Sequence, residues 1–293
     1  MSASATSATM SAASTATKTG IDPRWFSSSL LTLILVVGQW RFQILGDSYV
    51  PWMVALGTAL VTELVLWRTL RGGWPNILSA YISGNSIAIL VKPDGALLWP
   101  FAIGSFLSIA CKYTLNYKHR HLWNPTNFGI CVLLALASEH VSILSHQWGN
   151  EPLMVALIWT VGLLIVWRAK VLHLTLTYLA AFAVFAVLRA QLNGQSIATE
   201  LAPVTGPMYT LFMFFMVTDP KTIPKGRKVQ VLTVLAIAAL ECVFRILCDR
   251  EILGTHSPLR FAPALYALFL IGAPVFWWQL RKAPDPALTP ARA

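Results

Sequence analysis

The sequence predicts an all-α polytopic membrane protein with about ten transmembrane helices in two inverted repeats of five. Three observations support this fold class: the composition, a series of apolar runs of membrane-spanning length, and the placement of the basic residues. Of the 293 residues, 56% are hydrophobic and only 12% are charged, and the mean hydropathy is +0.62. Soluble domains contain about 25% charged residues, so lipid is expected to surround most of this chain.

A transmembrane helix needs about 20 mainly apolar residues. Ten runs of this kind follow one another with short loops between them: 28–45, 50–67, 75–92, 97–116, 125–144, 153–169, 171–192, 203–218, 229–248 and 261–280. They leave no room for a second, soluble domain. We therefore expect a single membrane domain over 25–282, with repeat halves at about 25–145 and 150–282. A disordered Ser/Ala/Thr-rich tail over 1–24 precedes it, and a short C-terminal tail over 283–293 follows it.

The basic residues test the number of spans independently. If the N-terminus lies in the cytoplasm, most of the 22 Lys and Arg residues fall in the cytoplasmic segments. These are Lys18, Arg24, Arg68, Arg71, Lys112, Lys118, Arg120, Arg168, Lys170, Lys221, Lys225, Arg227, Lys228, Arg281, Lys282 and Arg292. Cytoplasmic loops carry an excess of Lys and Arg, so both termini are predicted to be cytoplasmic. Topology thus explains the net charge of +10, and we expect the lipid bilayer, and no nucleic acid, as a partner.

The third and eighth spans are the least regular of the ten. The third contains Ser83-Gly84-Asn85 and ends at Lys92-Pro93-Asp94. The eighth begins at Thr205-Gly206-Pro207 and ends at Thr218-Asp219-Pro220-Lys221. Interrupted helices at corresponding positions of two halves indicate a binding site near the midplane, because freed backbone groups cannot stay unsatisfied in lipid. The alternative is a pair of short helices capped by ordinary turns.

Few charges lie within the apolar runs. Glu63 lies in the second run, and Glu241 and Arg245 lie four residues apart in the ninth, where they can pair on one helix face. An intramembrane pair of this kind is either structural or functional. The four cysteines form no C-x-x-C motif, and no hydrolase or phosphate-loop motif is present. We therefore predict no metal site and no catalytic residue.

Several segments together resemble the membrane subunits of the ion-translocating Rnf and Nqr redox complexes, the RnfD/NqrB family. These segments are 83–94, 121–129 with Asn124-Pro125, and 204–227 with its core at 214–221. The resemblance covers roughly residues 50–282. It implies a ten-helix inverted repeat that carries flavin, and a place in the bacterial inner (plasma) membrane beside other membrane or soluble redox subunits.

The chain differs from this family in the motif that binds flavin covalently. The resemblance places a flavin-bearing Thr of a Ser/Thr-x-Ala-Thr motif in the outer loop between spans five and six, here about 143–152. No such Thr occurs there, and the one matching string, at 196–199 and ending in Thr199, lies one outer loop later. Covalent flavin is therefore not expected. The missing flavin-bearing Thr indicates a divergent branch of the family. Family members that lack this motif also occur beside biosynthetic gene clusters, including those for enediyne products.

Two functions of different classes follow. The first is electron transfer with a non-covalent flavin (riboflavin or FMN). The chain would then be a subunit of an oxidoreductase complex. Its candidate cofactor-binding residues are Gly84, Asn85, Asn124, Asn127, Gly206, Thr218, Asp219 and Lys221. The second is a channel or permease for a small polar or planar solute, which needs the same broken helices and no cofactor. A scaffold subunit without redox chemistry is a further alternative.

Overall fold

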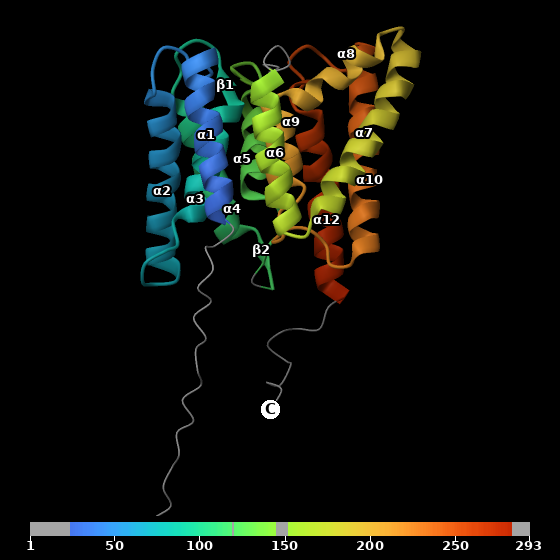
Figure 1. Cartoon of the computed structure of the whole chain (residues 1–293). Helices are drawn as coiled ribbons and strands as arrows, with labels where there is room; N and C mark the ends of the chain where they lie inside the picture. The colour runs from blue at the N-terminus through green and yellow to red at the C-terminus, as the bar shows by residue number, and fades with distance from the viewer. Residues whose placement is uncertain (1–23, 119, 145–151, 283–293) are drawn as a thin grey trace, which may run out of the picture.

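The computed structural model of the chain describes residues 24–118, 120–144 and 152–282. Helices dominate these residues and run side by side in one bundle (Figure 1). The longer ones are α1 (Arg24–Phe42), α2 (Val50–Leu70), α3 (Leu78–Leu90), α4 (Trp99–Thr114), α5 (Pro125–Ala137), α6 (Pro152–Arg168), α7 (Leu172–Asn193), α10 (Arg227–Asp249) and α12 (Pro263–Lys282). Four helices, α2, α7, α10 and α12, are long and apolar enough to cross a membrane. The described residues thus fit an all-α membrane protein.

Shorter elements lie between these helices. They are the helices α8 (Ile197–Leu201), α9 (Pro207–Leu211) and α11 (Pro258–Phe261), the 3₁₀ turn η1 (Ala202–Thr205), the π-helix η2 (Phe212–Met216), and the strands β1 (Val91–Pro93), β2 (Asn116–Tyr117), β3 (Arg120–His121) and β4 (Val141–Ile143). The predicted tails over 1–24 and 283–293 lie outside the described residues, except that α1 already begins at Arg24.

Helix boundaries follow ordinary capping chemistry. Asn124 caps α5, since its side chain accepts a hydrogen bond from the backbone N–H of Asn127 at 3.1 Å, and Pro125 takes the first helical position. The eighth apolar run breaks as its sequence predicts: Gly206 is extended (φ −76°, ψ 160°) and α9 begins at Pro207. At the other end, α7 stops where Gly194 adopts a left-handed conformation (φ +66°).

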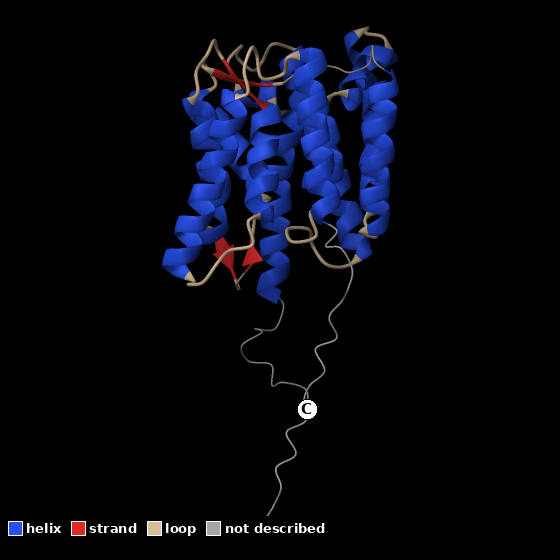
Figure 2. Cartoon of the chain, turned by 60° about the vertical axis from the view of Figure 1, so that its left-hand side comes forward, coloured by secondary structure: helices blue, strands red, loops and turns tan. Residues whose placement is uncertain are grey.

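Two predicted spans are shorter than their apolar runs, and this corrects the boundaries at 75–92 and 125–144. α3 ends at Leu90 and α5 at Ala137, because the residues that follow form strands β1 and β4. These strands pair in antiparallel register, with Val91 opposite Ile143 and Pro93 opposite Val141. Strand pairing satisfies backbone groups that the helices no longer bond. Figure 2 shows these strands at the upper end of the bundle and the β2–β3 pair at the lower end.

The helices pack in two sets. α2 contacts α3 and α4, and α4 packs closely on α5, whereas α10 contacts α7 and α12. Glycine makes the α4–α5 approach possible, because a Cβ atom on Gly129 would lie 2.6 Å from the Gly104 carbonyl oxygen. Contacts of α1 with α6, of α3 with α9 and of α5 with α12 join the two sets. One large apolar cluster runs through both.

Candidate functional site

A cavity of about 270 Å³ is lined by residues near the starts of α3 and α5. These helix ends lie at the lower end of the bundle (Figure 1). Its apolar wall comes from the second half of α6, including Leu164 and Ile165, and from Phe214 and Phe215 of η2. Its polar residues come from the first half of α3, the first turn of α5, β3, the segment 218–221, Ser27 of α1 and Arg168 at the end of α6. We call this the lower cavity. Four of the eight predicted cofactor-binding residues line it: Asn124, Thr218, Asp219 and Lys221.

A hydrogen bond across the cavity joins the two sequence motifs that carry the family resemblance. The Asn124 side-chain amide donates to Asp219 Oδ2 at 3.1 Å. The other carboxylate oxygen of Asp219 accepts from the backbone N–H of Lys221 at 3.0 Å. Arg120 adds a bond from its guanidinium to the Lys221 carbonyl oxygen at 3.0 Å. The segment 218–221 is therefore tied to the start of α5, and both have fixed positions at the cavity.

Three buried residues with hydroxyl groups, from three different elements, also line the cavity. Ser83 of α3 is 3% exposed, Thr126 of α5 is 5% exposed, and Thr218 after η2 is 3% exposed. Among the residues that the structure describes, none of these hydroxyls has a hydrogen-bond partner. The residues are buried, but their hydroxyls open on the cavity, where they can hydrogen-bond a ligand or ordered water.

The π-helix η2 contributes Phe214 and Phe215 to the cavity wall. π-Helical turns are rare and occur frequently at functional sites. Thr175 of α7 donates its hydroxyl to the Met213 carbonyl oxygen of this turn at 3.2 Å. On the other side, a Cβ atom on Gly162 would lie 2.4 Å from the Phe214 ring, so only glycine lets that ring lie against α6. The ring also meets Trp159 edge-on, with centroids 6.0 Å apart.

His121 is the titratable ring at the cavity. Burial lowers the pKa of its imidazole below the ordinary value of 6.5. The Asp219 carboxylate opposes this shift, whereas neighbouring Lys and Arg side chains add to it. The neutral ring is therefore favoured at pH 7.

The other four predicted residues do not line the lower cavity. Gly84 faces α2, and a Cβ atom added to Gly84 would lie 2.9 Å from the Leu56 Cα atom. The glycine therefore allows α3 to pack closely on α2. Asn85 accepts from Trp52 Nε1 at 2.7 Å and donates to the Tyr81 carbonyl oxygen at 3.0 Å.

Asn127 and Gly206 also have structural contacts. The Asn127 amide donates to the Leu265 carbonyl oxygen at 2.9 Å and so joins α5 to α12. The Gly206 carbonyl oxygen accepts from the Thr210 hydroxyl at 2.9 Å in the first turn of α9.

Sequence reasoning missed Thr126, His121 and Ser79 as cavity residues and named Ser83 only as part of a helix break. A usable signal was present for Thr126, which directly follows the Asn124-Pro125 cap. A hydroxyl in the first turn of a broken helix is a natural lining residue, since it lies beside the orphan N–H groups of that helix end.

The string at 196–199 forms the start of the short helix α8. The Ser196 hydroxyl caps α8, where it accepts from the backbone N–H of Thr199 at 3.1 Å, and it lies 2.8 Å from the Thr199 hydroxyl. α8 lies at the upper end of the bundle, away from the lower cavity (Figure 1). Within the expected flavin loop at 143–152, residues 145–151 lie outside the described residues.

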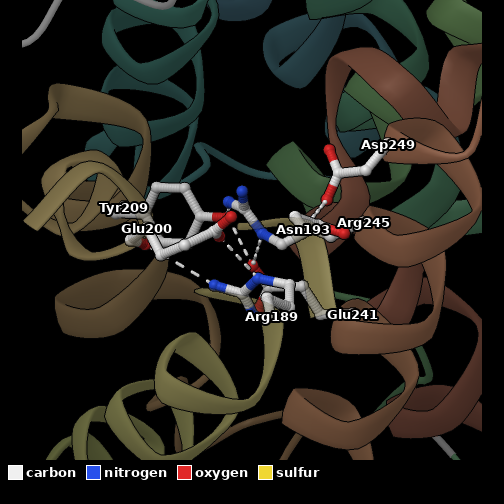
Figure 3. Close-up of polar contacts among 7 residues, drawn as sticks. All are labelled: Arg189, Asn193, Glu200, Tyr209, Glu241, Arg245 and Asp249. Atoms are coloured by element: carbon white, nitrogen blue, oxygen red, sulfur yellow. Dashed lines mark hydrogen bonds and ion pairs between the residues drawn. The ribbon is translucent and has the colours of Figure 1, made fainter. Parts of the chain in front are cut away.

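Buried ion pairs lie near both ends of the bundle. The predicted pair of Glu241 and Arg245 is confirmed, with Arg245 Nε 3.0 Å from the Glu241 carboxylate. Tyr178 and Tyr209 donate their hydroxyls to the same carboxylate. We call these four residues the upper cluster; Figure 3 shows three of them beside a neighbouring pair, Arg189 and Glu200.

A buried pair at the other end joins α2 to α4. Glu63, which the sequence showed as a lone intramembrane acid, bonds the Lys112 ammonium. Lys112 Nζ also lies 3.4 Å from the Ser79 hydroxyl oxygen, and Ser79 lines the lower cavity. We call Glu63 and Lys112 the lower pair. It is in contact with the candidate site.

No protein-family model matches this chain, and no curated protein matches it. The resemblance to the Rnf and Nqr membrane subunits therefore rests on the motif residues alone.

Proposed function

We propose that this chain is a multi-pass protein of the bacterial inner (plasma) membrane that holds a non-covalent flavin in the lower cavity and transfers electrons within or across the membrane. The observation that carries this proposal is the meeting of both family-like motifs at one cavity, through the Asn124–Asp219 hydrogen bond. Other membrane or soluble redox subunits would be its partners.

The proposal includes ten spans in two inverted halves of five, with both termini cytoplasmic. Helix packing supports this layout, because the α2–α4 and α4–α5 contacts have counterparts in α7–α10 and α10–α12. The contacts of α1 with α6, α3 with α9 and α5 with α12 join helices that are five spans apart in this scheme. The described chain also begins and ends at the lower end of the bundle, as an even number of spans requires (Figure 1).

The residues of the lower cavity fit riboflavin or FMN chemically. A flavin ring has an apolar end and an opposite edge of hydrogen-bond donors and acceptors. The Phe214 and Phe215 side chains offer an apolar surface, and the unpartnered hydroxyls of Ser83, Thr126 and Thr218 can donate or accept. The volume of about 270 Å³ is close to the lower limit of roughly 300–1,000 Å³ for ligand pockets, which favours a compact ligand over a dinucleotide. When bound, the flavin would supply one- or two-electron transfer.

The first experiment is a visible absorption and fluorescence measurement on protein purified in mild detergent, before and after acid denaturation. We expect a flavin spectrum that acid releases into the supernatant. The double variant Thr126→Val/Thr218→Val should retain less flavin, whereas Thr69→Val, an exposed hydroxyl on α2, should retain all of it.

A folded, colourless preparation that takes up neither added riboflavin nor FMN would overturn the proposal. Flavin that stays with the denatured chain would instead indicate covalent attachment, and Thr199→Ala would then test that residue.

A solute permease is the second candidate, and the Trp159–Phe214 contact beside the lower cavity favours it. Phe214 lines the lower cavity, and its ring lies edge-on against Trp159, which lines a second gap. This gap has no room for water, and Ile34, Pro207 and Thr210 line it with Trp159. If the chain is a permease, Trp159→Ala should open this point and increase the flux of small uncharged solutes into proteoliposomes. Equal flux in wild type, variant and empty liposomes would exclude this function.

A further inference from the structure

The lower pair, Glu63 and Lys112, differs from an ordinary structural ion pair in its third contact. Glu63 is 4% exposed, and the Lys112 side chain is 10% exposed. The Lys112 ammonium lies within hydrogen-bond distance of Ser79, whose side chain lines the lower cavity. A continuous chain of hydrogen bonds thus runs from a buried carboxylate, through an ammonium, to a hydroxyl at the candidate ligand site.

The surroundings of Lys112 come from several elements. The Tyr113 ring lies 5.9 Å from its Nζ atom, and the Arg71 guanidinium of the α2 end lies over the same ring at 5.6 Å. From the cavity side, the charges of Lys221 and His121 act on the same region, and Asp219 acts in the opposite sense on His121. Glu63 is the carboxylate in direct contact with Lys112. It can hold the Lys112 side chain in place whether the amine is charged or neutral.

We propose that Lys112 and Ser79 form a proton relay that serves the ligand of the lower cavity; this inference rests on the proposed flavin function. An external electron donor, such as dithionite, supplies the electrons. The Ser79 hydroxyl passes its proton to the reduced ligand, and the Lys112 ammonium gives one proton to the Ser79 oxygen. Lys112 then regains a proton from water at the lower end. Ser79 is thus the catalytic residue, and Glu63 is a positioning residue.

The chemistry of the buried pairs explains why the relay is assigned to this one. A lysine ammonium can give up a proton inside a protein, whereas an arginine guanidinium keeps its proton. The upper cluster contains Arg245 and lies among hydroxyls that already donate to Glu241. The neighbouring buried pair likewise contains an arginine, Arg189. Among the buried pairs of the described residues, only the lower pair combines a transferable proton with a contact to the lower cavity.

The test uses full-length protein loaded with FMN and reduced with dithionite in a stopped-flow instrument, in H₂O and in D₂O. Lys112→Arg keeps the charge beside Glu63 but cannot give up its proton, and Ser79→Ala removes the connecting hydroxyl. Both variants should slow flavin reduction by roughly tenfold or more, as expected for loss of a general acid, and should change the solvent isotope effect. Ser86→Ala is the matched control, since Ser86 is a buried serine of the same helix outside the cavity lining.

A second readout is independent of rate. A time-resolved infrared difference spectrum during reduction should contain a transient Glu63 carboxylate signal in wild type, while Lys112 has given up its proton, and this signal should be absent from Glu63→Gln and from Lys112→Arg. Wild-type rates and infrared signals in Lys112→Arg and Ser79→Ala, with FMN still bound, would overturn the relay alone. Failure of the wild-type protein to bind FMN would overturn both the relay and the proposed function.

Discussion

The upper cluster and the lower pair both contain a buried carboxylate, but their surroundings are very different. In the upper cluster, the Glu241 carboxylate receives hydrogen bonds from Tyr178, Tyr209 and Arg245, and the Arg245 guanidinium lies over the Phe182 ring at 5.4 Å. In the lower pair, Glu63 bonds Lys112, which reaches on to a serine at a cavity.

The difference is the one expected between a structural cluster and a pair that serves a ligand. A buried charge whose hydrogen-bonding capacity is filled by the protein has nothing left to offer a ligand, and it fixes the elements that contribute its partners. The upper cluster joins α7, α9 and α10 in this way and so holds the short helix α9 in place. The lower pair, in contrast, contacts Ser79 at the lower cavity. Three hydroxyls at this cavity have no partner within the described residues, so a ligand can hydrogen-bond there.

The largest effect is expected from breaking the upper cluster. Glu241→Leu leaves the half-buried Arg245, which is 18% exposed, without its carboxylate. The loss should therefore lie at or below the lower end of the roughly 3–5 kcal/mol that removal of one partner of a fully buried pair costs. The double variant Glu241→Leu/Arg245→Met should recover much of this loss, because no buried charge of the cluster remains unpaired. Thermal unfolding in detergent measures both. A Glu241→Leu protein as stable as wild type would show that the upper cluster is not structural.

Local sequence signals predicted part of this arrangement. The spacing of Glu241 and Arg245 predicted their contact, because residues four apart share a helix face. Thr205-Gly206-Pro207 predicted the start of a short helix, since extended backbone before proline ends any preceding helix. The apolar runs located the helices but overran them at Leu90 and Ala137, because the β1–β4 pairing joins segments about fifty residues apart.

Long-range contacts account for what the sequence left open. The Glu63–Lys112 pair joins residues 49 positions apart on two helices, and no local period places them together. The lower cavity depends on Ser83, Thr126 and Thr218, which come from three separate segments. Gly84 was predicted at the ligand because glycine permits close approach, but the approaching group is the α2 backbone. A glycine in a membrane helix predicts a close contact without naming the partner.

A smaller effect is expected from pH, and it should distinguish the lower end from the upper cluster. His121 has a lowered pKa in the folded protein, so the unfolded chain binds more protons as the pH falls below about 6.5. Stability should therefore be fully present above that pH and decrease as the pH falls towards 5.

The variant His121→Gln should lose this part of the pH dependence. Thermal unfolding at a series of pH values checks it, with Glu241→Gln as the comparison at the upper end. A steeper loss of stability at low pH in His121→Gln than in wild type would contradict the assignment.

The smallest effect on stability, and the sharpest contrast, is expected at the three cavity hydroxyls. Ser83→Ala, Thr126→Val and Thr218→Val each remove a cavity-lining hydroxyl that has no partner within the described residues, so stability should change by less than about 1 kcal/mol or rise. Thr175→Val is the matched control, because its hydroxyl bonds the Met213 carbonyl oxygen and its loss should cost about 0.5–1.5 kcal/mol.

Unfolding measurements without flavin, paired with flavin titrations, separate the two roles. The cavity variants should bind flavin more weakly at nearly unchanged stability, whereas Thr175→Val should lose stability and keep its flavin affinity. A stability loss in all four variants alike would mean that the cavity hydroxyls hold ordered water as part of the fold, and the contrast between a filled upper cluster and an open lower site would then fail.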